Sequence, residues 1–123
     1  MAQDLSAGKS LLDEGRYNQA LKFFEEILKT NPDNTEALNG IARANRLAGD
    51  SMTAIQFYQK SITVNLNQPE VWMNIGNILY HQKSFPEAAS SYQKAVTLDP
   101  RNPLAHNNLA SVFKEQGIMD KAI

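Results

Sequence analysis

The most informative segment of the chain is residues 69–102, which read PEVWMNIGNILYHQKSFPEAASSYQKAVTLDPRN. Apolar side chains recur at helical spacing in its first half, as at Trp72, Ile75 and Leu79, and they do so again in its second half. A short polar stretch separates the two halves. Pro100 follows the second half, and a proline there disfavours further helix. The segment therefore predicts two helices joined by a turn.

The same pattern repeats along the whole chain with a period of 34 residues. Four columns keep one register, and the glycine column has Lys83 in one slot. The columns are Gly15, Gly49 and Gly117; Ala20, Ala54, Ala88 and Ala122; Phe24, Tyr58 and Tyr92; and Gly8, Ala42, Gly76 and Ala110. Pro69 and Pro103 are expected to open helices at their first position. No segment shows the alternation that a half-buried strand needs.

These columns resemble the tetratricopeptide repeat, a helix–turn–helix of 34 residues. Residues 69–102 match at all eight signature places, which are Trp72, Ile75, Gly76, Leu79, Ala88, Tyr92, Ala95 and Pro100. The first two repeats depart from the pattern at Asp4, Asn45 and Leu66. The resemblance implies an all-α fold, a right-handed α-solenoid of stacked helix–turn–helix units. It predicts a single array over residues 1–123, with repeats 1–34, 35–68 and 69–102 and a partial repeat 103–123 that ends one or two residues into its second helix.

The pattern also has a packing reason. The small residues of the Gly8 and Ala20 columns should let two helices of one repeat approach closely. Phe24, Tyr58, Tyr92 and Trp72 should fill the space between adjacent repeats, since one helix pair cannot bury its apolar face alone. The partial fourth repeat should leave four apolar side chains uncovered, at Leu109, Val112, Phe113 and Ile118.

The composition of the chain narrows the classes of function that we expect. The chain has 123 residues, a formal net charge of −1, 42% hydrophobic residues and no cysteine. Such a balance favours one ordinary globular domain and argues against nucleic-acid binding. Without cysteine there is no disulfide framework or thiolate site. No apolar run approaches the length of a membrane span, and no secretory signal is visible, so we expect a cytoplasmic chain without membrane insertion.

Short motifs give no support for catalysis. Gly8-Lys9-Ser10 ends like a phosphate-binding loop, but Gln3 stands where the first glycine is required. His81 and His106 have no metal-ligand spacing. We therefore expect no enzyme activity, no cofactor and no metal.

In the family that the chain resembles, the first helix of each repeat lines a concave face that binds peptides. Carried over, the candidate peptide-binding residues are Asn39, Arg43, Arg46, Met73, Asn74, Asn77, Tyr80, Asn107 and Asn108. A primary amide can bond the N–H and C=O of a peptide together. Asn74 and Asn108 resemble the asparagine ladder of O-linked N-acetylglucosamine transferases, although Ser6 and Gly40 interrupt it.

Two further features of the sequence give little support for a charged ligand site. The carboxylate clamp that holds chaperone C-termini does not fit this sequence in either register that we considered. Arg43 and Arg46 could hold a carboxylate or phosphate of a partner, but exposed arginines on a helix are commonly just solvated.

The function that these residues favour is a non-catalytic protein–protein interaction scaffold that holds an extended peptide or a partner helix. An alternative is a substrate-docking or regulatory array of a larger enzyme, such as a glycosyltransferase similar to the O-linked N-acetylglucosamine transferases. A third hypothesis is self-association through the uncovered C-terminal end at Leu109, Val112, Phe113 and Ile118. Partner identity cannot be read from the fold, which hosts many functions.

Overall fold

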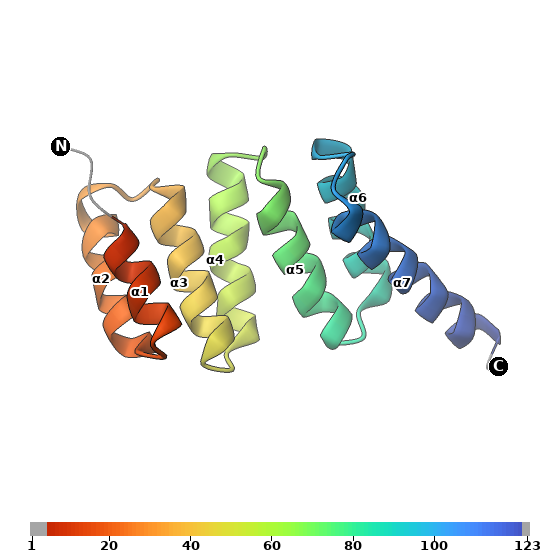
Figure 1. The fold of residues 1–123 in the computed structure, drawn as a ribbon, viewed down its shortest axis with the longest axis horizontal. Coiled ribbons are helices and arrows are strands. Elements are labelled where there is room, and N and C mark those ends of the chain that lie inside the picture. The colour runs from red at the N-terminus through yellow and green to blue at the C-terminus, as the bar shows by residue number, and fades with distance from the viewer. Residues whose placement is uncertain (1–4, 122–123) are drawn as a thin grey trace. The chain divides into compact units, whose positions relative to one another are not determined.

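The computed structural model describes residues 5–121, and these residues form helices and no strand. The helices are α1 (Ser6–Asp13), α2 (Tyr17–Thr30), α3 (Thr35–Leu47), α4 (Ser51–Val64), α5 (Pro69–His81), α6 (Phe85–Leu98) and α7 (Pro103–Lys121) (Figure 1). This confirms the all-α solenoid of helix–turn–helix units. Within the described range, no helix has both the length and the apolar character needed to cross a membrane.

The chain divides into two compact units. We call them the N-terminal unit, Met1–Leu66, and the C-terminal unit, Asn67–Ile123. The first contains α1 to α4 and the second contains α5 to α7.

Helix ends lie where the local chemistry predicts them. Pro69 and Pro103 are the first residues of α5 and α7, as expected, because the first turn of a helix needs no N–H from them. Helix α2 ends directly before Asn31 and Pro32. The side chain of Asn34 then caps α3, where its Oδ1 accepts a hydrogen bond of 3.0 Å from the N–H of Ala37.

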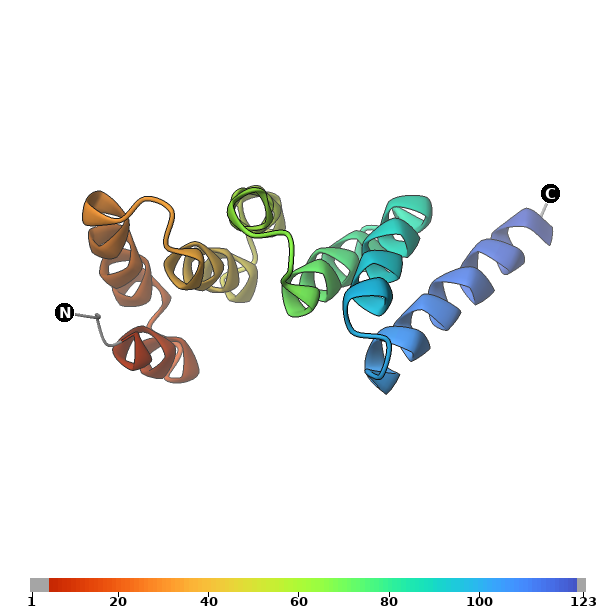
Figure 2. The same ribbon diagram turned by 90° about the horizontal axis from the view of Figure 1, so that it is seen from above.

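The core of the N-terminal unit centres on Phe24. Helices α1, α2 and α3 pack side by side here (Figures 1 and 2). The ring of Phe24 touches the backbone of two helices, at Gly8 in α1 and at Gly40 in α3. A Cβ atom at Gly8 would lie 2.7 Å from Cε1 of Phe24, so only glycine fits. Phe24 therefore fills the space between the first two repeats, as the sequence predicted.

The core of the C-terminal unit is built in the same way around Tyr92. Its ring lies against Gly76, where a Cβ would be 2.6 Å from Cε1. Val112 of α7 packs into the same cluster and is 0% exposed. The expectation that Val112 is uncovered is therefore wrong, because α7 packs directly on α6. Phe113 and Ile118, at 55% and 53% exposed, are uncovered as expected, whereas Leu109 is half-buried.

The turns within the repeats use left-handed backbone. Gly15 and Gly49 have φ angles of 77° and 96°, and Lys83 has a φ of 63° in the same slot. The Cβ of lysine is sterically strained in this conformation, whereas glycine has no Cβ and is not strained. Gly117 departs from this pattern, because it lies inside α7, which Figure 2 shows as one continuous helix. The predicted column residue Ala122 and the departure at Asp4 lie outside the described residues.

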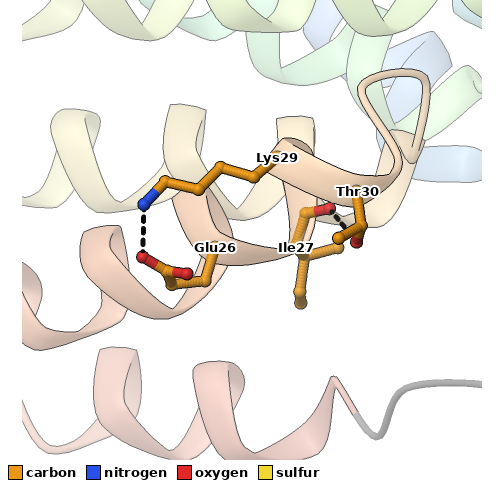
Figure 3. Close-up of polar contacts among 4 residues, drawn as sticks. All are labelled: Glu26, Ile27, Lys29 and Thr30. Carbon is orange, nitrogen blue, oxygen red and sulfur yellow. Dashed lines mark hydrogen bonds and ion pairs between the residues drawn. The ribbon is translucent and has the colours of Figure 1, made fainter.

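The outer surface of α2 carries ordinary local contacts. Nζ of Lys29 lies 2.7 Å from Oε1 of Glu26, and Oγ1 of Thr30 donates to the C=O of Ile27 at 3.2 Å (Figure 3). The hydrogen bond to Glu26 raises the pKa of Lys29. Both charged groups are exposed, so the pair adds little stability.

Candidate functional site

A polar hollow opens between α5 and α7 in the C-terminal unit. Its volume is about 200 Å³, and its lining residues are Asn77, Tyr80, His81, Tyr92, Asn108 and Ser111. We call it the asparagine hollow. The residues come from three helices, since Tyr92 reaches it from α6. None of them carries a carboxylate, an ammonium or a guanidinium group.

Hydrogen bonds fix the orientation of Asn77 in this hollow. The hydroxyl of Tyr92 donates to Oδ1 of Asn77 at 2.5 Å, and Nδ2 of Asn108 approaches the same oxygen at 3.5 Å. The acceptor side of Asn77 is therefore occupied from within the protein. Its amide N–H groups remain as donors that can point to a ligand.

The structure brings three of the predicted site residues together here, and they are Asn77, Tyr80 and Asn108. Asn74, half-buried on α5, and Asn107, exposed on α7, are not part of the lining. Within the hollow, Asn108 lies beside Asn77, with Nδ2 of Asn108 3.5 Å from Oδ1 of Asn77.

Met73 differs from the other predicted residues. Its side chain is 6% exposed and belongs to a buried cluster with Ala95 and Ala105. Its sulfur lies 3.6 Å from Nδ2 of Asn102. Met73 therefore packs between helices, and we leave it out of the proposed binding surface.

The predicted residues of the N-terminal unit lie on α3. Asn39 and Arg46 are half-buried and Arg43 is exposed. Nη2 of Arg43 lies 4.0 Å from Oδ1 of Asp13 on α1, and both side chains are about half exposed. This is a long, solvated ion pair of small energetic value, which a ligand can displace at little cost.

Sequence reasoning missed part of the hollow. Tyr92 was expected to act in packing, and its ring does so, but its hydroxyl also orients Asn77. His81 also lies at the hollow, beside Tyr80, with ring centroids 5.8 Å apart. Its helical spacing from Asn77 is consistent with both residues lying on one face of α5. Among the described residues, no three side chains of metal-binding type gather in one place.

Comparison with protein families matches most of the chain to one kind of repeat. A family model described as "Tetratricopeptide repeat" matches residues 11–78, and one described as "TPR repeat" matches residues 76–117.

Curated relatives are 26% to 35% identical over the aligned residues. The chain is 35% identical over 74 residues to the photosystem I assembly protein Ycf3 of Synechococcus sp. (strain CC9605). That alignment covers 58% of this chain and 43% of Ycf3. Across the curated relatives the coverage runs from 15% to 45% of their length, so the chain spans less than half of them.

Solved structures share the fold at low sequence identity. The Yersinia enterocolitica type III secretion chaperone SycD, in complex with a peptide of the translocator YopD, superposes with a TM-score of 0.83 at 17% identity, covering 91% of each chain. The first TPR of Spaghetti (RPAP3), bound to the HSP90 peptide SRMEEVD, gives 0.84 at 18% identity and covers 91% of this chain and 89% of that one.

Proposed function

The chain belongs to the tetratricopeptide repeat family, and from this premise we propose that it is a non-catalytic protein–protein interaction scaffold. Its ligand is an extended peptide or a helix of a partner protein. The observation that carries the proposal is the asparagine hollow, in which amide groups stand oriented at an open surface. The two solved relatives that hold peptides support it by analogy of fold.

The chemistry of the hollow suits the main chain of a peptide. Asn77 offers N–H groups, and Asn108 offers both an N–H and a carbonyl oxygen. No lining residue carries a fixed charge, so a charged group of the ligand would be unpaired in the hollow. Its desolvation would cost more than that of a neutral peptide group. The hollow therefore favours contacts that do not depend on the side chains of the ligand.

The N-terminal unit carries a charged surface of its own. Arg43 and Arg46 lie on α3 with Asn39, spaced so that all three share one helix face. A carboxylate of the ligand would compete with Asp13 for Arg43. We expect this contribution to weaken as salt rises, because exposed charges are screened.

A binding experiment tests the proposal. Short peptides selected from a displayed random library on the whole chain serve as ligands for titration calorimetry. We expect Asn77→Ala and Asn108→Ala each to weaken binding by about 2- to 10-fold, the equivalent of one net hydrogen bond. The double variant Asn74→Ala with Asn108→Ala tests the ladder pair. Asn18→Ala, an exposed asparagine on α2, is the matched control and should leave the affinity unchanged.

The result that contradicts the proposal is equally clear. If selected peptides bind the Asn77→Ala and Asn108→Ala variants as tightly as the wild type, while circular dichroism shows the variants folded, then the asparagine hollow is not the binding surface.

Self-association is a second candidate, favoured by the exposed side chains of α7. Phe113 and Ile118 are both more than half exposed. Sedimentation over a wide concentration range distinguishes the two states. A mass that rises from 13.7 kDa with concentration in the wild type, and stays constant in Phe113→Ser with Ile118→Ser, would establish the contact. A constant mass in the wild type would remove it.

A further inference from the structure

A second hollow lies in the N-terminal unit, on the loop between α2 and α3 and on the last two turns of α4. Its volume is about 280 Å³. The lining residues are Pro32, Asp33, Leu38, Lys60, Thr63 and Val64. None of them belongs to the proposed peptide-binding surface.

The 34-residue period shows what the same place holds in the next repeat. Trp72 stands where the second repeat has Leu38, and Lys94 stands where it has Lys60. In the C-terminal unit Trp72 packs against the cluster that contains Ala95, and Nζ of Lys94 lies 4.4 Å from the centroid of the indole ring. The third repeat therefore fills this place with its own aromatic side chain.

The second repeat lacks that ring but keeps similar residues around it on its second helix. Thr63 and Val64 correspond to Thr97 and Leu98, whereas Pro32 and Asp33 correspond to Leu66 and Asn67. Leu38 is shorter than tryptophan and forms only the buried floor. Lys60 lies instead 4.4 Å from the ring centroid of Phe57, which has no aromatic equivalent in the third repeat. By the repeat register, the hollow corresponds to the place of the Trp72 indole one repeat later.

We propose that this hollow receives an aromatic side chain, in particular a tryptophan, from a partner protein. Pro32, Leu38 and Val64 provide apolar walls. Lys60 provides a cation that can move from Phe57 to the incoming ring, as Lys94 does over Trp72. The carboxylate of Asp33 can accept the indole N–H.

The volume of the hollow, about 280 Å³, lies at the lower end of the roughly 300–1,000 Å³ of pockets for small ligands, so a single side chain is a suitable occupant. An aromatic anchor in a pocket is also the kind of contact that dominates the energy of protein interfaces.

The test uses N-acetyl-tryptophanamide as the probe and the methyl NMR signals of Leu38, Thr63 and Val64 as the readout. We expect these signals to shift in a saturable way. N-acetyl-leucinamide is the matched control probe and should shift them at least tenfold less at equal concentration. Leu38→Trp places an indole in the hollow from within and should abolish the shifts of Thr63 and Val64.

Two further variants keep the test decisive. Trp72→Leu should open the equivalent hollow in the C-terminal unit and create new shifts at Thr97 and Leu98. Val64→Asp changes an exposed rim residue, so it leaves the fold intact and should weaken the probe at least fivefold even if Leu38→Trp does not fold.

Three outcomes would overturn the proposal. They are equal shifts with both probes, shifts that persist in Leu38→Trp, and no saturation in the wild type. A peptide with one central tryptophan separates the two sources of an indole. If the peptide binds at least tenfold tighter than N-acetyl-tryptophanamide, the result supports a protein partner. Equal affinity assigns the hollow to a free aromatic molecule and contradicts the proposal of a protein partner.

Discussion

Replacing Gly40 with alanine is the sharpest test of how the repeats pack. A Cβ at this position would lie 2.5 Å from Cε2 and 2.7 Å from Cδ2 of Phe24. The ring cannot move away, because Phe24 is 4% exposed and also touches Gly8 on its other side. Alanine is therefore expected to force a shift of the packed helices.

Two opposing effects set the magnitude. Alanine in a helix interior is favoured over glycine by about 0.8–1.0 kcal/mol. Overpacking of a well-packed core costs about 1–3 kcal/mol. Three ring atoms lie closer to the added Cβ than real Cβ contacts allow, so we place the cost near the upper end. The net effect is a loss of about 1–2 kcal/mol, equivalent to a fall of roughly 4–8 °C in Tm.

The assay is thermal unfolding followed by circular dichroism, with Gly117→Ala as the matched control. A Cβ at Gly117 meets nothing within 4 Å, so that variant gains helix propensity alone and should be more stable by about 0.8–1.0 kcal/mol. Phe24→Leu combined with Gly40→Ala should destabilise less than the sum of the two changes. If Gly40→Ala raises Tm as Gly117→Ala does, the packing of Phe24 on Gly40 is refuted.

Three further predictions concern other parts of the fold. Tyr92→Ala should cost about 3–5 kcal/mol in thermal melts, because the side chain is 2% exposed, and a loss below 1 kcal/mol would contradict its place in the core. Lys83→Gly should stabilise the chain by about 0.5–1 kcal/mol by relieving the φ of 63°, and an unchanged Tm would count against strain at that turn. The Thr53 hydroxyl and N–H hold the pKa of Asp50 below its usual range. The stability that the ionised carboxylate gives to the folded state is therefore present at neutral pH and is lost as the pH falls through the folded pKa. Asp50→Ala should therefore lower Tm at pH 7, with a difference from wild type that narrows below roughly pH 4, and a difference independent of pH would refute the cap.

Most of the fold could be predicted because its signals are local or periodic. Pro69 and Pro103 mark helix starts through their own geometry. The contacts of Gly8 and Gly76 follow from the 34-residue register, since each meets the aromatic residue of the second helix in its own repeat.

The structural features that the sequence did not predict depend on contacts between neighbouring repeats. Gly40 was expected only as a missing rung of the asparagine ladder, whereas the structure shows that Phe24 occupies the space of any side chain there. Met73 has the helical spacing of a surface residue but is buried under α7. Helix α7 continues through Gly117, which the glycine column alone does not indicate.

The sequence predicts asparagines on the binding face but gives no signal for which of their side chains meet. Asn77 and Asn108 were both expected on the binding face, and they meet in the asparagine hollow. The hydroxyl of Tyr92 that orients Asn77 comes from the second helix of the repeat, so a search limited to first helices could not include it.

The most direct test of the proposed function is side-chain amide NMR during titration with a library-selected peptide. We predict that the Nδ2 resonances of Asn77 and Asn108 shift and saturate together, because these groups face the bound main chain. The amide of Asn18 on α2 should stay unchanged. Saturating shifts confined to other residues, with Asn77 and Asn108 unmoved, would contradict the central claim that this hollow binds peptides.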